Sequence, residues 1–317
     1  MKKRIAVIVP VSVFEPAETL VNSARHLRSL DFGDFEFTIL YAFDGDESDE
    51  RVKLLRREGV DVLARNTRRG KRAGAINDAI RHLKKFKPDL VAIFDADSRP
   101  ERDFVLRCAG RVERDVYISS TVRKVSNPYT LIARAVELEY RLIGFLLKVS
   151  GFRQFNGLIG VLNFRHLERY GLSEDALTED ADFATRMHAL GFRAELAEGC
   201  VYEQSPVTIS DFYSQRKRWY YGGLELWRYL DRVLPSGNPH FVTSWLSALT
   251  LTYFPILYLP FVLLSLPALL ALYGKDGVLV YAGMILYAVT LQIASFSAML
   301  NFLRREGVEW KAMTRVE

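Results

Sequence analysis

The carboxy-terminal part of the chain is almost free of charge, and this feature limits the possible folds more than any other. Between Phe241 and Leu303 the only charged side chains are Lys275 and Asp276. Two apolar runs, 245–273 and 278–303, are each longer than the roughly 20 residues with which a helix crosses a bilayer. A chain of 317 residues cannot enclose so much apolar surface in a soluble core. We therefore predict a transmembrane hairpin of two helices over residues 240–303.

Prolines divide the first of these runs. Pro255, Pro260 and Pro267 each lack a backbone donor, so we expect them to kink the first span or to split it. The connecting turn, Gly274 to Gly277, is neutral overall because Lys275 and Asp276 cancel.

Basic residues flank the apolar region on both sides, which by the positive-inside rule favours a cytosolic location for both flanks. They are Arg216, Lys217, Arg218, Arg228 and Arg232 before it, and Arg304, Arg305, Lys311 and Arg315 after it. The apolar run that ends at Pro10 is only six residues long, which is too short for a signal peptide. We predict a multi-pass protein of the cell membrane with a cytosolic domain at 1–232 and a cytosolic tail at 304–317.

Bulk composition indicates the partners of the chain. The net charge of +5 is modest and lies largely near the apolar runs, where it suits anionic lipid headgroups. We expect membrane lipid as a partner and do not expect nucleic acid. The two cysteines, Cys108 and Cys200, are expected to be unpaired core residues in the reducing cytosol.

The first 120 residues alternate short apolar runs with amphipathic stretches. The runs 5–9, 37–43, 60–63, 90–94 and 116–121 are typical of buried strands. Between them, 72–86 places its apolar residues at helical spacing. This alternation predicts an α/β domain with a doubly wound, mostly parallel sheet. A later amphipathic stretch, 129–149, is expected to form a helix at the membrane interface.

Polar residues stand where strands end, which in such sheets is the edge that binds ligands. Pro10 ends the first strand, Asp44 follows the second, and Asp95 and Asp97 follow the fourth. Two carboxylates one residue apart suit magnesium or manganese, which can neutralise a diphosphate. The alternative is an ordinary solvated turn. At Asp44 the carboxylate could accept hydrogen bonds from a base or a ribose.

A basic loop, 68–71, precedes the helix at 72–86. It fails the phosphate-loop pattern, because Arg65 replaces its first glycine and Arg72 replaces its Ser or Thr. We nevertheless expect Lys71 to contact a nucleotide.

Two further motifs lie later in the chain. Thr178, Glu179 and Asp180 form a helix cap and an acidic first turn, and a carboxylate such as Asp180 could also remove a proton from an acceptor hydroxyl. The cluster from Gln215 to Trp219 is basic and aromatic, and its alternative interpretation is a membrane-interface anchor.

In this order the motifs resemble family 2 glycosyltransferases over residues 4–232, and most closely the membrane-integrated branch of cellulose, chitin and hyaluronan synthases. The motif residues are Pro10, Asp44, Lys71, Asp95, Asp97, Phe155, Asn156, Gly157, Thr178, Glu179, Asp180, Gln215, Arg218 and Trp219. The resemblance implies a GT-A fold and a single displacement that inverts the anomeric carbon of a nucleotide-sugar donor.

The same resemblance implies a role for each matching residue. Asp44 would contact the uridine of a UDP-sugar, and Asp95 and Asp97 would engage the nucleotide and a divalent cation. Asp180 would be the general base. Arg218 would stabilise the leaving diphosphate. The acceptor site would include Phe155, Asn156, Gly157, Gln215 and Trp219.

The chain also departs from the large synthases, which carry additional transmembrane helices before and after the catalytic domain. Two helices make a poor polymer channel, so three alternatives stay open: a homo-oligomer, a product that is not extruded, or a membrane-lipid acceptor. The main prediction is a synthase that extends a saccharide or lipid-linked acceptor. The first alternative is transfer of a single sugar to a polyprenyl-phosphate or another lipid.

Two other classes fit less well. A sugar nucleotidyltransferase would carry a glycine-rich loop after its first strand, and residues 11–16 contain no glycine. A non-catalytic membrane binding protein would have no need of Asp97, Asp180 and Arg218 together.

Overall fold

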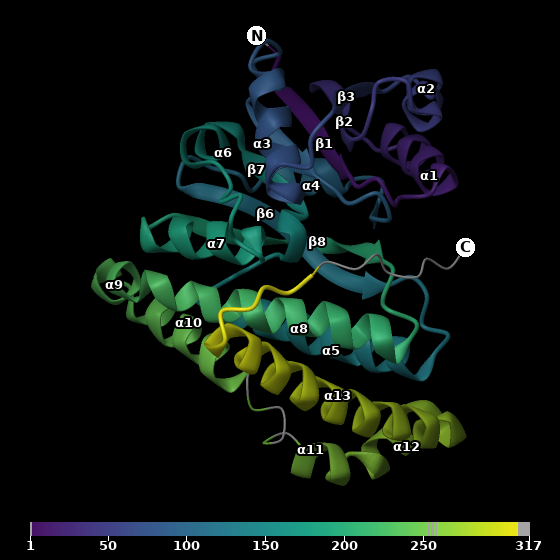
Figure 1. The fold of residues 1–317 in the computed structure, drawn as a ribbon, viewed down its shortest axis with the longest axis vertical. Helices are drawn as coiled ribbons and strands as arrows, with labels where there is room; N and C mark the ends of the chain where they lie inside the picture. The colour runs from purple at the N-terminus through teal and green to yellow at the C-terminus, as the bar shows by residue number, and fades with distance from the viewer. Residues whose placement is uncertain (1, 253, 255–256, 258, 310–317) are drawn as a thin grey trace. The chain divides into compact units, whose positions relative to one another are not determined.

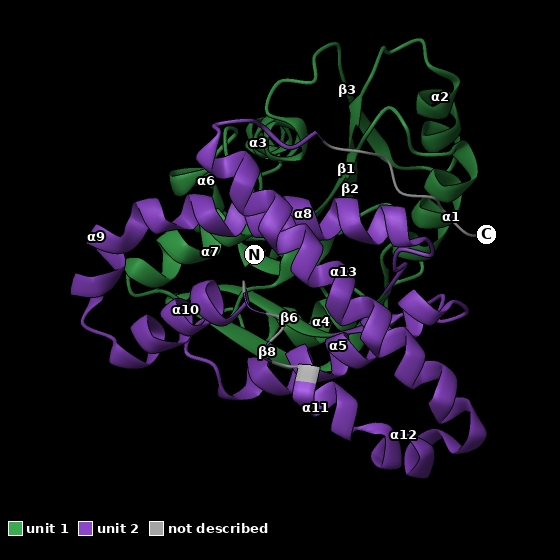
Figure 2. Ribbon diagram, turned by 60° about the horizontal axis from the view of Figure 1, so that its bottom comes forward, with its two compact units in different colours: residues 1–122, 153–202 green, residues 123–152, 203–317 purple. Residues whose placement is uncertain are grey.

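The computed structural model describes residues 2–252, 254, 257 and 259–309. Pro255 and the predicted tail residues Lys311 and Arg315 lie outside the described residues. The chain forms two compact units that interleave in the sequence (Figure 2). Unit 1 comprises Met1–Val122 and Arg153–Tyr202, and unit 2 comprises Arg123–Phe152 and Glu203–Glu317. The consecutive division at 1–232, 240–303 and 304–317 stays a prediction.

An eight-stranded mixed sheet has the order β3-β2-β1-β4-β7-β6-β8-β5. Strands β3, β2, β1 and β4 are parallel, whereas β4 and β7, β7 and β6, and β8 and β5 pair in antiparallel fashion. The bounds are β1 Arg4–Val11, β2 Glu36–Asp44, β3 Asp61–Arg65, β4 Leu90–Ile93, β5 Arg99–Pro100, β6 Val116–Val125, β7 Gly160–Asn163 and β8 Arg193–Glu203. The predicted α/β sheet is confirmed, with an antiparallel extension that the sequence pattern did not indicate.

Helices cover both faces of the parallel strands (Figure 1). Those of unit 1 are α1 Ala17–Arg28, α2 Glu50–Arg57, α3 Lys71–Leu83, α4 Phe104–Ala109, α6 Phe164–Tyr170 and α7 Glu179–Ala189. Alternate residues of β1, such as Ile5, Val7 and Val9, pack in one core with apolar residues of α1, α2 and α4. Helix α3 packs on β1 and β2 through the apolar face expected for 72–86.

Unit 2 is helical. Its helices are α5 Leu131–Val149, α8 Ile209–Glu225, α9 Leu230–Val233, α10 Pro239–Leu251, α11 Leu259–Leu264, α12 Leu266–Tyr273 and α13 Gly277–Leu303. Helix α13 packs against α8 and α5, and the three lie side by side (Figure 1). A Cβ atom at Gly283 of α13 would lie 2.7 Å from the Leu131 carbonyl oxygen, so a glycine permits this close approach.

The prediction of two transmembrane helices is wrong. Among the described residues, one helical segment, Leu266–Leu303, is long and apolar enough to cross a membrane. The first predicted span is divided between α10, α11 and α12, which are 13, 6 and 8 residues long. Pro260 and Pro267 lie at the second positions of α11 and α12, where a missing N–H does no harm, whereas inside a continuous helix each would remove a hydrogen bond.

Candidate functional site

The carboxyl ends of the parallel strands bring the predicted polar residues to one edge of the sheet. Pro10 of β1 is in register with Ala42 of β2, and Asp44 at the end of β2 is in register with Arg65. After β4 the chain turns at once. The Ser98 hydroxyl accepts from the Asp95 N–H at 3.1 Å, and the Ser98 N–H donates to the Asp95 carbonyl at 3.0 Å. This turn carries Asp95 and Asp97.

Arg72, the second residue of α3, joins three of the predicted motifs. Its guanidinium donates to Asp95 Oδ1 from Nε at 3.0 Å and from Nη2 at 2.8 Å. It also donates from Nη1 to Glu179 Oε1 at 2.7 Å, and from Nη2 to the Gly157 carbonyl at 2.5 Å. Sequence reasoning considered Arg72 only as a mismatch to a phosphate-loop pattern and missed this role.

Gly157 connects the same cluster to Asp180 through its backbone. Its N–H donates to Asp180 Oδ2 at 2.5 Å, while the Ala181 N–H donates to Oδ1 at 2.8 Å. Gly157 has a φ of 65°, and an added Cβ would lie 3.3 Å from both Arg72 Nη2 and Asp95 Oδ2. Backbone conformation and lack of space both favour glycine at this position.

The start of α7 differs from the prediction in one respect. Thr178 occupies the N-cap position, but its side chain makes no capping hydrogen bond, and its buried hydroxyl has no partner among the described residues. The Glu179 carboxyl is buried against Arg72. Burial raises the pKa of Glu179 above its ordinary value and the Asp180 charge adds to the rise, whereas Arg72 opposes it. Thus Glu179 is a partner of Arg72 and not a solvated first-turn residue.

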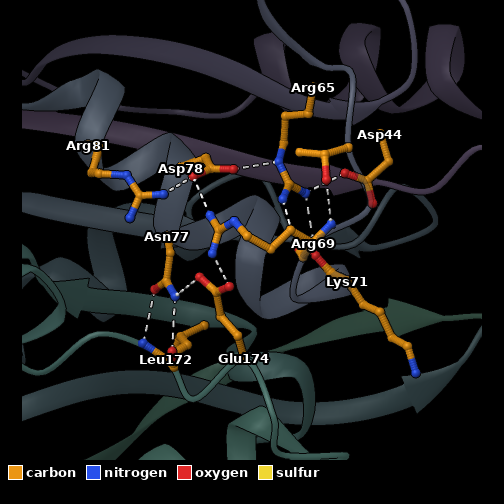
Figure 3. A network of polar contacts seen from close by, with 10 residues as sticks. Asp44, Arg65, Arg69, Lys71, Asn77, Asp78, Arg81, Leu172 and Glu174 are labelled. Carbon is orange, nitrogen blue, oxygen red and sulfur yellow. Dashed lines mark hydrogen bonds and ion pairs between the residues drawn. The ribbon is translucent and has the colours of Figure 1, made fainter.

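A second polar network surrounds Asp44 (Figure 3). Asp44 forms an ion pair with Arg65 Nη1, and Arg65 Nε donates to Asp78 Oδ2 at 2.7 Å. Arg65 is 5% exposed, and its Nη2 donates to the Arg69 carbonyl at 2.7 Å. Burial raises the pKa of Asp44 to about 6, although Arg65 acts in the opposite direction. The sequence pattern did not indicate Arg65 as the partner of Asp44.

The same network ties the segment before α7 to α3 (Figure 3). Arg69 pairs with both Asp78 and Glu174. Asn77 Nδ2 donates to the Leu172 carbonyl at 2.9 Å and to Glu174 Oε1 at 3.0 Å, and the Leu172 N–H donates to Asn77 Oδ1 at 3.0 Å. These contacts fix the approach of the chain to Thr178–Asp180.

Three further predicted residues, Lys71, Phe155 and Asn156, differ in their exposure to solvent. The Lys71 side chain is exposed and extends away from the Arg65 network (Figure 3). Phe155 is buried, at 5% exposure, whereas Asn156 is half-buried at the start of a short 3-10 helix, Asn156–Leu158.

Asp95 and Asp97 do not form a complete metal site by themselves. They fit a site whose remaining ligands come from a bound substrate. Both contacts from Arg72 to Asp95 use Oδ1, so Oδ2 is the oxygen that a cation could use. Among the described residues, no group of three or more His, Cys, Asp or Glu side chains is placed to hold a metal ion. Asp95 and Asp97 would therefore need further oxygen ligands, such as those of a diphosphate.

The remaining predicted residues belong to unit 2. Gln215, Arg218 and Trp219 are half-buried and, at spacing i, i+3 and i+4, share one face of α8.

Two family models match the chain. The model described as Glycosyl transferase family 2 matches residues 7–168, and the model described as Glycosyl transferase family group 2 matches residues 90–294. Both contain the residues after β4.

Several curated relatives come from plants. Probable glucomannan 4-beta-mannosyltransferase 3 of Oryza sativa subsp. japonica is 30% identical over 181 residues, which are 54% of this chain and 33% of the relative. The protein of the same name from Arabidopsis thaliana is 29% identical over 201 residues, 60% of this chain and 36% of the relative. The chain thus spans about a third of the length of these relatives.

Solved structures share the fold. The mannosyltransferase PcManGT from Pyrobaculum calidifontis, in complex with GDP-Man and Mn2+, has a TM-score of 0.59 at 19% identity, covering 97% of this chain and 89% of that one. S. aureus TarS 1–349 in complex with UDP-GlcNAc has a TM-score of 0.51 at 14% identity, covering 97% and 94%. These likenesses support the predicted GT-A-type α/β fold.

Replacing Gly157 with alanine tests whether close packing at the Arg72 cluster requires glycine. Gly191 is the matched control, because it also has a positive φ, of 86°, but an added Cβ would have nothing within 4 Å. We expect Gly191→Ala to lower the free energy of unfolding by about 1 kcal/mol from backbone strain alone. Gly157→Ala should lose about 1–3 kcal/mol more, because Arg72 and Asp95 must shift. Equal losses in denaturant titrations would show that the cluster tolerates the methyl group.

Proposed function

The chain belongs to glycosyltransferase family 2, and on this premise we propose that it transfers a hexose, with inversion, from a nucleotide-sugar to a saccharide or lipid-linked acceptor at the membrane. One observation carries the proposal. The backbone of Gly157 and the guanidinium of Arg72 bring Asp95 and Asp180 into one cluster. A single displacement needs one group that holds the donor, directly or through a cation, and one base that takes the proton of the acceptor. Asp95 and Asp180 are proposed to fill these two roles.

Asp180 is the proposed general base. Two backbone N–H groups, of Gly157 and Ala181, hold its two oxygens and so fix the orientation of the carboxylate. The acceptor hydroxyl gives its proton to Asp180 as its oxygen bonds to the anomeric carbon. The bond from that carbon to the nucleoside diphosphate breaks in the same step, and inversion follows without a covalent intermediate on the enzyme.

The donor side is assigned to Asp44, Asp95 and Asp97. Asp95 and Asp97 would hold magnesium or manganese, which when bound offsets the charge of the diphosphate. Asp44 would accept a hydrogen bond from the nucleoside. By resemblance, Arg218 would stabilise the departing oxygen, while Gln215 and Trp219 would contact the acceptor.

Two donors compete. The motif resemblance predicts a UDP-sugar, whereas the curated relatives are named as mannosyltransferases and the PcManGT structure contains GDP-Man. TarS, which has the same fold, contains UDP-GlcNAc. Glucomannan-type mannosyl transfer from GDP-mannose is therefore the second candidate, and single-sugar transfer to a polyprenyl-phosphate is the third.

The decisive experiment measures release of nucleoside diphosphate by the detergent-purified protein from UDP-sugars and GDP-mannose, with manganese or magnesium, lipid extract and oligosaccharides. We expect one donor to be turned over, and Asp180→Asn to lower turnover by about 10²–10⁴-fold because the acceptor proton loses its base. Asp34→Asn, at an exposed position, is the matched control. Undiminished transfer by Asp180→Asn would remove this residue from the role.

The proposed metal site is tested with a second variant in the same experiment. Asp97→Ala should weaken metal-dependent nucleotide binding, which Asp180→Asn should leave largely intact. Unchanged metal-dependent binding by Asp97→Ala would refute the proposed cation site.

Donor affinity should depend on pH through Asp44. Its pKa of about 6 means that the carboxyl is mostly protonated below this pH and is then a weaker hydrogen-bond acceptor for the nucleoside than the carboxylate is. We expect affinity for the nucleotide-sugar to rise by about tenfold between pH 5 and pH 7.5. The intact donor is the right probe, because the terminal phosphate of a free nucleoside diphosphate titrates in the same range. Asp44→Asn should bind weakly at every pH, and a retained pH dependence in this variant would assign the titration to another group.

Membrane attachment is proposed to occur through unit 2, with the catalytic residues in the cytosol. Helix α13 and the short helices α11 and α12 expose apolar side chains, among them Phe261, Leu264, Leu272 and Phe296. Arg304 and Arg305 follow the apolar segment and are also proposed to be cytosolic, so the chain must return to the side from which it entered, since a single crossing would place the two ends of the segment on opposite sides.

An alkaline carbonate wash of cell membranes tests the attachment. We expect the protein to stay in the membrane pellet and to be released only by detergent, because burial of apolar surface holds it and not charge alone. Release by carbonate would indicate a peripheral, electrostatic association.

A further inference from the structure

Helix α8 carries a buried arginine inside the motif that supplies Gln215, Arg218 and Trp219. Arg216 is 3% exposed and lies on a buried stripe with Phe212 and Tyr220, at spacing i and i+4. The motif residues occupy the neighbouring, half-buried face of the same helix. The proposed function gives Arg216 no role.

Arg216 is fixed on both sides. Its Nη2 forms an ion pair with Glu139 Oε2 of α5 at 2.5 Å, and the Glu139 side chain is 18% exposed. Its guanidinium carbon lies 4.1 Å from the centre of the Trp219 ring and 5.0 Å from that of Phe212. At 4.1 Å a cation is within the range of a favourable cation–π contact.

Helix α13 contributes a third residue, Tyr287, beside the ion pair of Arg216 and Glu139. Tyr287 of α13 is hydrogen-bonded to Glu139, and its ring centre lies 5.0 Å from that of Phe212. Farther along, Ala294 and Ala298 of α13 pack against Tyr220 and its neighbours on α8. The long apolar helix α13 is thus connected to Trp219 through Glu139 and Arg216.

The buried charges suggest a role other than stability. Apolar residues of similar size usually stabilise a helix contact as well as a buried ion pair does. The Nε of Arg216 is also buried without a hydrogen-bond partner among the described residues, which adds to the cost of the pair. What the pair supplies, and an apolar contact would not, is a planar cation held at a fixed place over one ring.

We propose that Arg216, held by Glu139, is a positioning residue for Trp219, and through it for the acceptor end of the reaction. The acceptor role of Trp219 rests on the proposed function, whereas its placement by Arg216 does not. An indole held by a cation over its ring presents an apolar surface of the kind on which the less polar face of a sugar ring packs.

The test compares two replacements of the pair. Glu139→Leu with Arg216→Met removes both charges and keeps the apolar volume, so the fold should persist. Arg216→Lys keeps the charge and the pairing with Glu139 but lacks the planar guanidinium. Each is made with and without Trp219→Phe, so that the difference isolates Trp219 among the four tryptophans.

The first readout is the fluorescence of Trp219 in the full-length protein. Loss of the adjacent cation should shift its emission maximum in the double variant, because a nearby charge displaces the energy of the indole excited state. Arg216→Lys should also shift it, since the ammonium is not held over the ring. If the emission of Trp219 is the same in the double variant and in Arg216→Lys as in the wild type, Arg216 does not position this ring and the proposal is overturned.

The second readout is transfer from GDP-mannose to β-1,4-linked mannotetraose. The KM for mannotetraose should rise about tenfold in both variants, with a smaller change in kcat and an unchanged affinity for the donor. A purely structural role would instead lower Tm and active fraction without moving KM. An unchanged KM beside a shifted spectrum would refute the link to the acceptor, and absence of transfer by the wild type would count against the mannosyl candidate while the spectrum still decides the placement of Trp219.

Discussion

The guanidinium of Arg72 is the contact on which the rest of the candidate site depends. It lies between the carboxylates of Asp95 and Glu179 and also binds the Gly157 carbonyl. Removal of such a group would leave partly buried carboxylates facing one another without a counter-ion, which costs several kcal/mol, of order 3–5, in comparable pairs. The turn after β4, the loop at Gly157 and the start of α7 are therefore held in one arrangement by a single side chain.

The first turn of α3 organises both polar networks. Arg65 and Arg72 flank the loop that enters this helix, and Arg65 binds the Arg69 carbonyl within it. Gly74 brings the helix against the loop, since an added Cβ would lie 1.9 Å from the Arg69 carbonyl oxygen. This tightly packed region at the start of α3 thus determines the surroundings of Asp44 and of Asp95, the residues proposed to bind the nucleoside and the diphosphate.

Local sequence patterns predicted the four parallel strands, β6 and the positions of the acidic residues, because these depend on short-range periodicity and on the edge at which parallel strands end. They did not predict Arg65 and Arg72 as ion-pair partners of carboxylates. Arg72, which follows the basic loop, resembles a solvated residue until the fold brings to it carboxylates that lie 23 and 107 residues away in the sequence. The first predicted transmembrane helix failed for a different reason: hydropathy counts apolar residues, whereas Pro260 and Pro267 each stand near the start of a new short helix and so divide the run, as the prolines in the sequence had suggested.

Gly157 joins Asp180 and Arg72 through main-chain atoms alone. The bridge uses main-chain atoms of Gly157, so it favours glycine at this one position but does not itself constrain the side chains of neighbours such as Asn156. If the proposed roles hold, substitutions beside it can alter the shape and polarity of the acceptor site while the proposed base, Asp180, stays in place. The arrangement thereby separates the chemistry of the reaction from the choice of acceptor, and leaves the latter open to change during evolution.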